Sequence, residues 1–154
     1  MSDRNRMVLF LGALVLLWGG SAVWGETVYW AHDLRHHHLP WRAWAASEWL
    51  LGRIPLWAPG VGNGFPLLAE GQGGFLYPPT MLLFALLPAG VAQNEAILLH
   101  LFWAGLGAYA LARTLGRRPL AAAVAGVGFG FSGFLATHAL YLGMLAVASW
   151  LPWA

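Results

Sequence analysis

The chain has no cysteine, no lysine and few charged residues of either sign. Only 9% of its 154 residues are charged, whereas 59% are hydrophobic and the mean hydropathy is +0.62. Soluble domains carry about 25% charged residues, so the composition excludes an ordinary soluble domain and indicates a membrane protein. The absence of cysteine excludes disulfides and thiolate metal sites. The basic residues are eight arginines scattered over short segments, a pattern that favours a topology signal over a nucleic-acid-binding surface.

The order of apolar and polar segments predicts an all-α membrane protein with several transmembrane helices and a long first outer loop that contains short interface helices. We expect eight segments: a cytoplasmic N-terminus (1–6), transmembrane helix 1 (7–24), an outer loop (25–74), a re-entrant or interfacial helix (75–88), transmembrane helix 2 (95–112), a cytoplasmic turn (113–119), transmembrane helix 3 (120–136) and the start of a further apolar segment (140–154).

The first apolar run has 18 uncharged residues and follows two arginines. A bilayer core needs about 20 apolar helical residues, so this run is long enough to span it. The alternative is a cleaved signal peptide with a weak cleavage site at Gly20-Ser21-Ala22. Bulky Val23 and Trp24 continue the apolar run, which favours an uncleaved anchor. In either case the loop that follows lies outside.

The stretch Phe75–Leu87 is apolar but short. At 1.5 Å per residue it reaches about 20 Å, less than the ~30 Å core of a bilayer. Pro78-Pro79 suits the start of a helix and Pro88 its end. We therefore expect a helix that enters or lies on the membrane without crossing it.

The arginines predict the topology. Arg113, Arg117 and Arg118 gather in one short turn, which the positive-inside rule places in the cytoplasm together with Arg4 and Arg6. If both groups of arginines lie in the cytoplasm, the chain must cross the membrane an even number of times between them. This parity holds only if Phe75–Leu87 does not cross. We expect a multi-pass protein of the bacterial inner (plasma) membrane.

The C-terminal third is one apolar run, residues 120–151, that is too long for a single span. We expect it to break around Gly133–His138, so that a third span is followed by a further apolar segment. The chain ends within this segment, at Trp153-Ala154, with no polar tail. We therefore expect the N-terminal part of a longer protein, with the C-terminal remainder missing.

Glycines in the third span form the pattern G-x-G-x-x-G from Gly128 to Gly133. A dinucleotide site needs a strand before this pattern and a soluble helix after it, and a mid-span position offers neither. Gly126 and Gly130, four residues apart, instead predict a face for close packing of helices.

The outer loop, residues 25–74, holds four of the six acids, four of the six histidines, three of the eight arginines and five of the ten tryptophans. Tryptophans prefer the membrane–water boundary, which predicts an aromatic belt and a loop that lies on the bilayer surface. Such a position suits a site for a lipid-linked substrate.

His36, His37 and His38, with His32 and Asp33 nearby, raise the possibility of a metal site. Successive helical residues point about 100° apart, so three consecutive histidines do not face one ion. A patch facing solvent or headgroups is favoured, and we expect no metal and no cofactor. His100, inside the second span, predicts a buried polar contact between helices, although intramembrane ionisable groups are often functional.

Asp33 lies nine residues after the first span. One interpretation is the N-cap of a helix over about residues 34–51, because aspartate is a favoured cap. The other is a general base in a cleft at the membrane surface, where partial burial raises a carboxyl pKa toward the useful range. The spacing alone leaves both open.

The run from His32 to Pro79, with GRIPLWAPGVGNGFPLLAEGQGGFLYPP (52–79) at its centre, resembles the first outer loop of YfhO-type bacterial membrane proteins. The later RTLGRRPLAAAVAGVGFGFSGF (113–134) is also similar to that family. These proteins resemble the C superfamily of glycosyltransferases, which use polyprenyl-phosphate sugars. The likeness covers most of the chain after Ala31.

The resemblance implies a role for six residues. Asp33 takes the position of the catalytic acid of the first loop and accepts a proton from the acceptor hydroxyl while the sugar leaves its phosphate with inversion. Glu70 and Gln72 line the substrate cleft or form a helix end or turn. Arg35, Arg42 and Arg53 are the candidates for binding the lipid phosphate, since guanidinium groups pair with phosphate oxygens.

Two departures accompany this likeness. Many superfamily members have paired acids in the loop, whereas Asp33 stands between His32 and Leu34, and the chain lacks the further spans and outer domain of such enzymes. The fragment alone is therefore expected to be inactive. The alternatives are a segment of a transporter or flippase for a lipid-linked substrate and a non-catalytic membrane scaffold. A transporter would need charged residues within its spans, where His100 stands alone.

Overall fold

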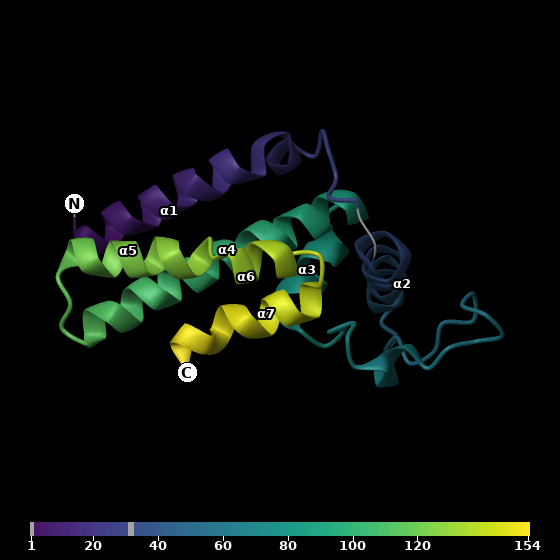
Figure 1. Cartoon of the computed structure of the whole chain (residues 1–154). Coiled ribbons are helices and arrows are strands. Elements are labelled where there is room, and N and C mark those ends of the chain that lie inside the picture. The colour runs from purple at the N-terminus through teal and green to yellow at the C-terminus, as the bar shows by residue number, and fades with distance from the viewer. Residues whose placement is uncertain (1, 31–32) are drawn as a thin grey trace.

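The computed structural model describes residues 2–30 and 33–154, and its regular elements are helices (Figure 1). In chain order they are α1 (Asp3–Gly19), η1 (Gly20–Trp24), η2 (Leu34–His38), α2 (Leu39–Leu50), η3 (Leu67–Glu70), α3 (Pro78–Leu86), α4 (Ala89–Thr114), α5 (Pro119–Gly130), α6 (Gly133–His138), α7 (Leu142–Trp150) and η4 (Leu151–Trp153). In this described part of the chain, the extended segments form one isolated bridge, between Ala58 and Phe65. The expectation of an all-helical chain is confirmed for these residues.

Within the described residues, three helical stretches are long and apolar enough to cross a membrane: Asp3–Trp24, Ala89–Thr114 and Pro119–His138. Each overlaps one of the predicted spans. The second is longer than expected because the helix begins directly after Pro88, and its 26 residues reach about 39 Å. The nine-residue α3 reaches only about 14 Å, so it is too short to cross a bilayer core.

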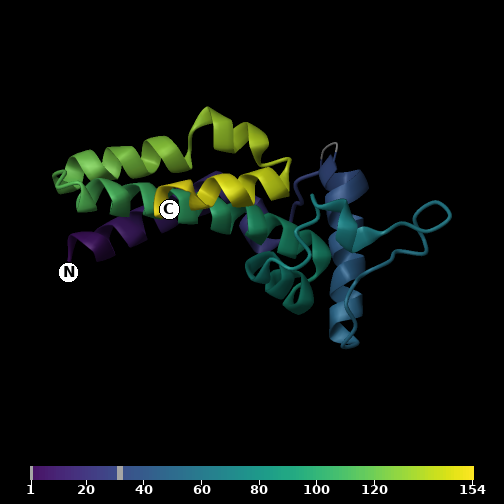
Figure 2. The same cartoon turned by 90° about the horizontal axis from the view of Figure 1, so that it is seen from below.

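The long helix α4 is the centre of the bundle, and α1, α3, α5 and α7 pack around it (Figures 1 and 2). Many of its buried side chains belong to two large hydrophobic clusters, one shared with α6 and α7 and the other with α1 and α5. The first contains Ile97, Leu101, Leu135, Leu142 and Leu145; the second contains Met7, Leu11, Tyr109 and Ala122. Because each cluster contains side chains from several helices, their burial holds the apolar helices together as one bundle.

The contact between α4 and α5 depends on glycines. A Cβ atom on Gly130 would lie 2.8 Å from the Cα of Gly105, and one on Gly126 would lie 2.8 Å from the Gly105 carbonyl oxygen. A Cβ on Gly128 would meet nothing within 4 Å. The predicted packing face of Gly126 and Gly130 is therefore confirmed, because the absence of side chains lets the two backbones touch.

The apolar run after residue 120 is divided at two places. The helix α5 ends at Gly130, and Ser132 begins α6 by accepting a hydrogen bond from the amide of Leu135 at 3.3 Å. The chain then reverses after His138 and enters α7. Residues 133–138, where we expected the break, are thus themselves helical, because the serine cap starts a new helix and moves the reversal further along.

Two polar residues of α4 hold the segment after α1 in place. The buried Asn94 amide donates to the carbonyl oxygens of Ala22 and Thr27, at 2.9 and 2.7 Å, and its oxygen accepts from the amide of Tyr29 at 3.1 Å. Gln93 donates to the carbonyl oxygen of Tyr29 at 2.7 Å. Irregular backbone next to a bilayer needs such partners inside the protein. These bonds set the point from which the chain continues toward Asp33.

The helix α2 lies across one end of the bundle, with α3 between it and α4 (Figures 1 and 2). Ala46, Phe84 and Ala92, one from each of these helices, form a shared cluster. The segment between α2 and α3 packs on another part of α2, where Ala45 meets Leu67 and Phe75. The outer loop is therefore a packed unit at the end of the bundle.

Candidate functional site

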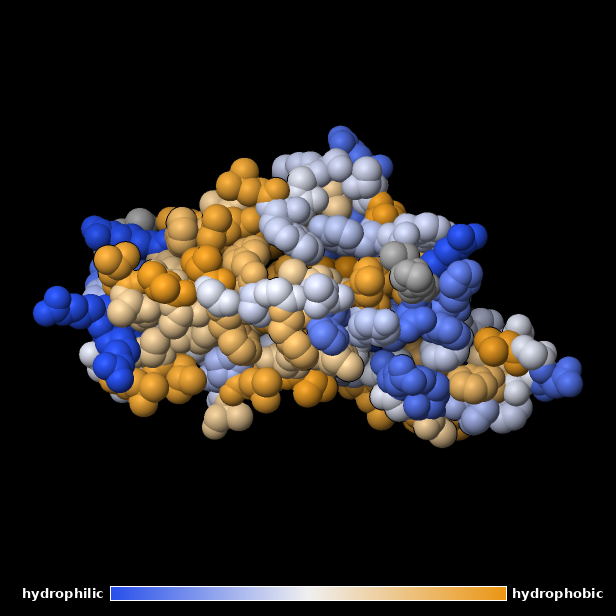
Figure 3. Space-filling model, viewed as in Figure 1, coloured by the Kyte–Doolittle hydropathy of each residue, from blue (hydrophilic) through white to orange (hydrophobic). Residues whose placement is uncertain are grey.

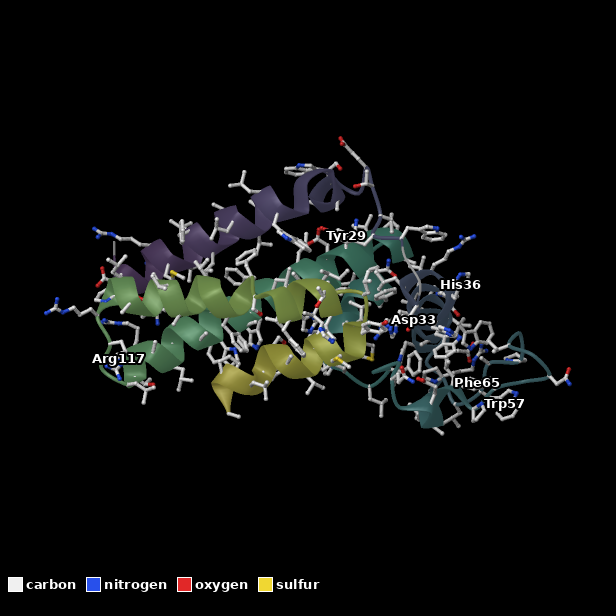
Figure 4. The ribbon with its side chains drawn as sticks, in the orientation of Figure 1. Tyr29, Asp33, His36, Trp57, Phe65 and Arg117 are labelled. Carbon is white, nitrogen blue, oxygen red and sulfur yellow. The ribbon has the colours of Figure 1, made fainter. Side chains whose placement is uncertain are left out.

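A cleft of about 160 Å³ lies at the end of the bundle between α2 and the turn that follows η3. Its lining is Asp33, His37, His38, Trp41, Glu70 and Gln72. Three of the predicted site residues, Asp33, Glu70 and Gln72, are thus brought to one place although up to 39 positions separate them in the sequence. Figure 4 shows Asp33 where the end of the bundle meets the outer loop.

The first four lining residues are aligned by a widened helical turn. In η2 the amide of Leu39 donates to the carbonyl oxygen of Leu34, five residues earlier, as in a π-helix. In such a turn the residues four and five positions after Asp33 both lie on its side of the helix, so His37 and His38 join it in the cleft. Single π-turns are frequent at functional sites.

The Asp33 carboxylate is directed to the cleft instead of to the helix end. Asp33 has helical backbone angles, φ −65° and ψ −26°, and its side chain makes no capping hydrogen bond within the described chain. The helix that was expected after Asp33 is present as η2 followed by α2, but it begins without an aspartate cap. Among the residues that the structure describes, the half-buried carboxylate has no hydrogen-bond partner, which leaves it open to the cleft.

Glu70 forms a turn and also lines the cleft. One of its carboxylate oxygens accepts hydrogen bonds from the amides of Gln72 and Gly73, each at 2.9 Å, and Gly71 between them has a left-handed φ of 83°. The same side chain lines the cleft. The turn is also closed by α7, because a Cβ on Gly143 would lie 2.9 Å from the carbonyl oxygen of Gln72.

Arg42 lies one turn after His38 and is almost completely buried, with 5% of its surface exposed. Burial lowers its pKa to about 10, and the Glu70 carboxylate opposes this shift, so the guanidinium is charged at neutral pH. Its Nε and Nη1 atoms have no hydrogen-bond partner among the residues that the structure describes. A buried cation with free N–H groups is a strong site for an anion.

His38 is the buried member of the histidine triplet. Burial lowers its pKa to about 4, the Arg42 charge adds to this effect, and Asp33 opposes it. The imidazole is therefore neutral at pH 7 and lies in the cleft beside an acid.

The other two histidines of the triplet, His36 and His37, are exposed. Within residues 2–30 and 33–154, no three histidine, aspartate or glutamate side chains gather as ligands of a metal ion. His32, which belonged to the metal hypothesis, lies outside the described residues.

The other two predicted phosphate ligands lie away from the cleft. The Arg35 guanidinium stands over the ring of Trp30, 5.2 Å from its centroid. Arg53 binds both carboxylate oxygens of Glu48, at 2.6 and 2.8 Å, and this pairing lowers the pKa of Glu48. Of the three arginines, only Arg42 is close enough to the cleft to interact with Glu70 and His38.

His100 makes the buried contact that its position in the second span predicted. Its Nε2 lies 3.0 Å from the Tyr77 hydroxyl, and Trp150 Nε1 donates to the same hydroxyl at 2.7 Å. Its Nδ1 bonds the carbonyl oxygen of Ala96. Tyr77 thereby joins α4 and α7 to the end of the outer loop.

Sequence reasoning missed His37, His38 and Trp41 as cleft residues. The positions 33, 37 and 41 share helical spacing, which is the signal that could have found two of them. Trp41 also stacks on Phe65, with ring centroids 5.4 Å apart, and so positions the loop beyond the cleft.

Comparisons with protein-family models, curated proteins and solved structures found no match to this chain. Its function is therefore inferred from the cleft, the span pattern and the chemistry of the residues themselves.

Proposed function

We propose that this chain is a membrane glycosyltransferase, or the N-terminal part of one, that takes a sugar from a polyprenyl-phosphate donor on the outer face of the membrane. The observation that carries the proposal is the cleft in which Asp33, Glu70 and Gln72 meet beside the buried Arg42. The cleft offers a carboxylate and hydrogen-bonding side chains for a sugar, and the Arg42 cation lies behind its lining, close enough to act on the charges of Glu70 and His38. The resemblance to YfhO-type proteins and to the C superfamily of glycosyltransferases leads to the same proposal.

In this proposal Asp33 is the general base. Its carboxylate takes the proton of an acceptor hydroxyl while that oxygen forms a bond to the anomeric carbon. The bond from this carbon to the phosphate oxygen breaks, its electron pair leaves with the polyprenyl phosphate, and the configuration inverts. Arg42 stabilises the negative charge of the leaving phosphate.

The remaining lining residues orient the substrate. Gln72 offers an amide to sugar hydroxyls, and the neutral His38 offers a ring nitrogen without adding charge next to the base. Trp41 provides an apolar face beside these polar groups. Arg35 lies over the ring of Trp30 and Arg53 is bound to Glu48. Each of these arginines would therefore have to leave its partner before it could bind the lipid phosphate.

The position of the cleft supports a lipid-linked substrate. Figure 3 shows hydrophobic residues over the bundle and hydrophilic residues at both of its ends. Arg117 and Asp33 lie at opposite ends (Figure 4). If the arginine-rich end faces the cytoplasm, the cleft lies on the outer side at the height of the headgroups, within reach of a lipid phosphate.

A transporter or flippase segment is the second candidate, and a non-catalytic scaffold is the third. Transport through the bundle would need polar side chains along a path between its ends. Asn94 and His100 are instead bonded to neighbouring segments near the cleft end. The described part of the bundle therefore favours a site at the surface over a path through it.

The test is the variant Asp33→Asn in the full-length protein, with Glu26→Gln as the matched control. Glu26 is an exposed acid of the same outer loop and does not line the cleft. We expect Asp33→Asn to lower transfer of radiolabelled sugar from a polyprenyl-phosphate donor by at least about 100-fold, the range of general-base catalysis. The control is expected to retain activity, and both variants to insert into membranes. Full activity of Asp33→Asn would overturn the proposal.

A further inference from the structure

A groove at the arginine-rich end of the bundle is unconnected with the cleft. It measures about 760 Å³ and lies between α1 and α4, with η4 on one side. Its lining is Ser2, Asp3, Arg4, Val8, Leu106, Tyr109, Ala110, Arg113 and Trp153. Apolar side chains make up the walls, and the two arginines come from the helix ends, so the groove is apolar inside and basic at its mouth.

The mouth of the groove carries excess positive charge. Arg4, Arg6, Arg113, Arg117 and Arg118 lie at this end of the bundle, and Figure 4 shows Arg117 there. Asp3 is the only acid among the lining residues. Its carboxylate lies 3.9 Å from the guanidinium of Arg6, which does not line the groove. Arg4 and Arg113 therefore outnumber the single acid of the lining, and Arg113 Nη1 also donates to the Arg117 carbonyl oxygen at 2.8 Å.

The inner wall of the groove is held in place by specific contacts of Trp153. The Trp153 ring stacks on Trp103, with centroids 4.2 Å apart, and its Nε1 donates to the Trp103 carbonyl oxygen. It sits against Gly107, where an added Cβ would lie 2.4 Å from the ring. The absence of a side chain at Gly107 therefore leaves room for the Trp153 ring that forms this wall.

We propose that this groove binds an anionic phospholipid of the cytoplasmic leaflet, with an acyl chain along the apolar wall and the phosphate between Arg4 and Arg113. Basic pockets between transmembrane helices on the cytoplasmic side bind such headgroups. The inference rests on the proposed membrane position of α1 and α4 and is independent of the glycosyltransferase chemistry.

A further helix does not fit within the groove, whereas one acyl chain of a lipid does. A ten-residue helix with its side chains occupies roughly 1,200 Å³, taken as a cylinder 10 Å wide and 15 Å long. This exceeds the groove, so a helix would lie over it and leave the space between α1 and α4 unfilled. A thin, flexible acyl chain enters it.

The experiment is native mass spectrometry of the chain purified in mild detergent, titrated with phosphatidylglycerol or with phosphatidylcholine of the same acyl chains. We expect phosphatidylglycerol to bind at least about tenfold more tightly, since each arginine near an anionic lipid contributes about a fivefold factor. The double variant Arg4→Gln with Arg113→Gln should lose this preference. The matched control, Arg117→Gln with Arg118→Gln, removes the same charge from the same end outside the groove and should keep it.

A second variant, Ala110→Trp, fills the groove while every arginine remains. It should lower phosphatidylglycerol binding as much as the double arginine variant does, with helical content checked by circular dichroism. Equal loss in the two arginine pairs would mean general attraction to a basic surface and overturn the proposal. So would unchanged binding in Ala110→Trp, full competition by glycerol phosphate without acyl chains, or a dimer that excludes the lipid.

Discussion

Among the described side chains of the bundle, Asn94 makes the most hydrogen bonds to irregular backbone. Its three hydrogen bonds reach Ala22, Thr27 and Tyr29, residues 65 to 72 positions away. Both its donor and its acceptor are used, and the side chain is fully buried. One amide thus determines how the outer segment leaves the first span.

Replacing Asn94 with alanine should be strongly destabilising. Two carbonyl oxygens and one amide would lose their partner in buried or part-buried places, at about 1–3 kcal/mol each. We expect a loss of at least about 3 kcal/mol in the free energy of unfolding, measured by denaturant titration in detergent micelles. Asn63→Ala, the same change at an exposed loop position, is the control. Equal midpoints for the two variants would contradict this role.

His38 should make stability depend on pH. Its pKa is about 4 in the folded protein and 6.5 as a free side chain, so between these values the unfolded chain binds a proton that the folded chain does not. The free energy of unfolding is therefore highest above pH 6.5 and falls as the pH drops toward 4, by at most about 1.4 kcal/mol per pH unit.

The variant His38→Gln tests this dependence. It should flatten the change in melting temperature between pH 6.5 and 4, because the titrating group is gone. His36→Gln removes an exposed histidine of the same triplet and should leave the slope intact. The assignment fails if both variants keep the wild-type slope.

At the scale of the elements, the backbones of α4 and α5 touch where Gly126 and Gly130 face Gly105. Hydropathy predicted the two helices, and the spacing of Gly126 and Gly130 predicted the face that they share. The residue that this face contacts, Gly105, is known only from the structure. It could not be predicted because the register of one helix against another depends on every side chain along the contact.

Gly130→Ala should destabilise this pair of helices. The new methyl group would lie 2.8 Å from the backbone of Gly105, and such overpacking costs about 1–3 kcal/mol. Gly128→Ala is the matched change two residues earlier, where a Cβ meets nothing, and it should be neutral or slightly stabilising because alanine favours helix. Melting temperatures in detergent compare them. A Gly130→Ala protein as stable as the Gly128→Ala protein would contradict the packing argument.

The wide turn η2 is an element that hydropathy did not predict. An ordinary α-helix from Asp33 would align residues 33, 37 and 41 but direct residue 38 away from them. The π-turn adds His38 to the cleft and places Arg42 one turn behind it. Its cause is tertiary, because Leu34 and His38 are both buried there.

At the scale of the whole molecule, the two ends of the bundle differ. One end carries five arginines and a groove, and the other carries the outer loop and the cleft. Figure 3 shows hydrophobic surface between them. This arrangement fits a bilayer with the arginines on the cytoplasmic side.

The proposed topology can be tested cleanly because the chain has no cysteine. Single variants Asn63→Cys, in the outer loop, and Thr114→Cys, at the arginine-rich end, are both at exposed positions. With a membrane-impermeant maleimide, we expect Asn63→Cys to be labelled in intact spheroplasts and Thr114→Cys only after the membrane is opened. The parent chain gives no background. Labelling in the reverse order would refute the topology.

The sequence by itself determined the helical class, the approximate positions of three span-length helices and the glycine face, because hydropathy and helical spacing are local properties of the chain. It also marked Asp33, Glu70 and Gln72. Only the tertiary structure decided that these three share a cleft, and that Arg42 lies beside it while Arg35 and Arg53 are engaged elsewhere. Such outcomes depend on contacts between residues far apart in the sequence, and these follow from how the helices pack.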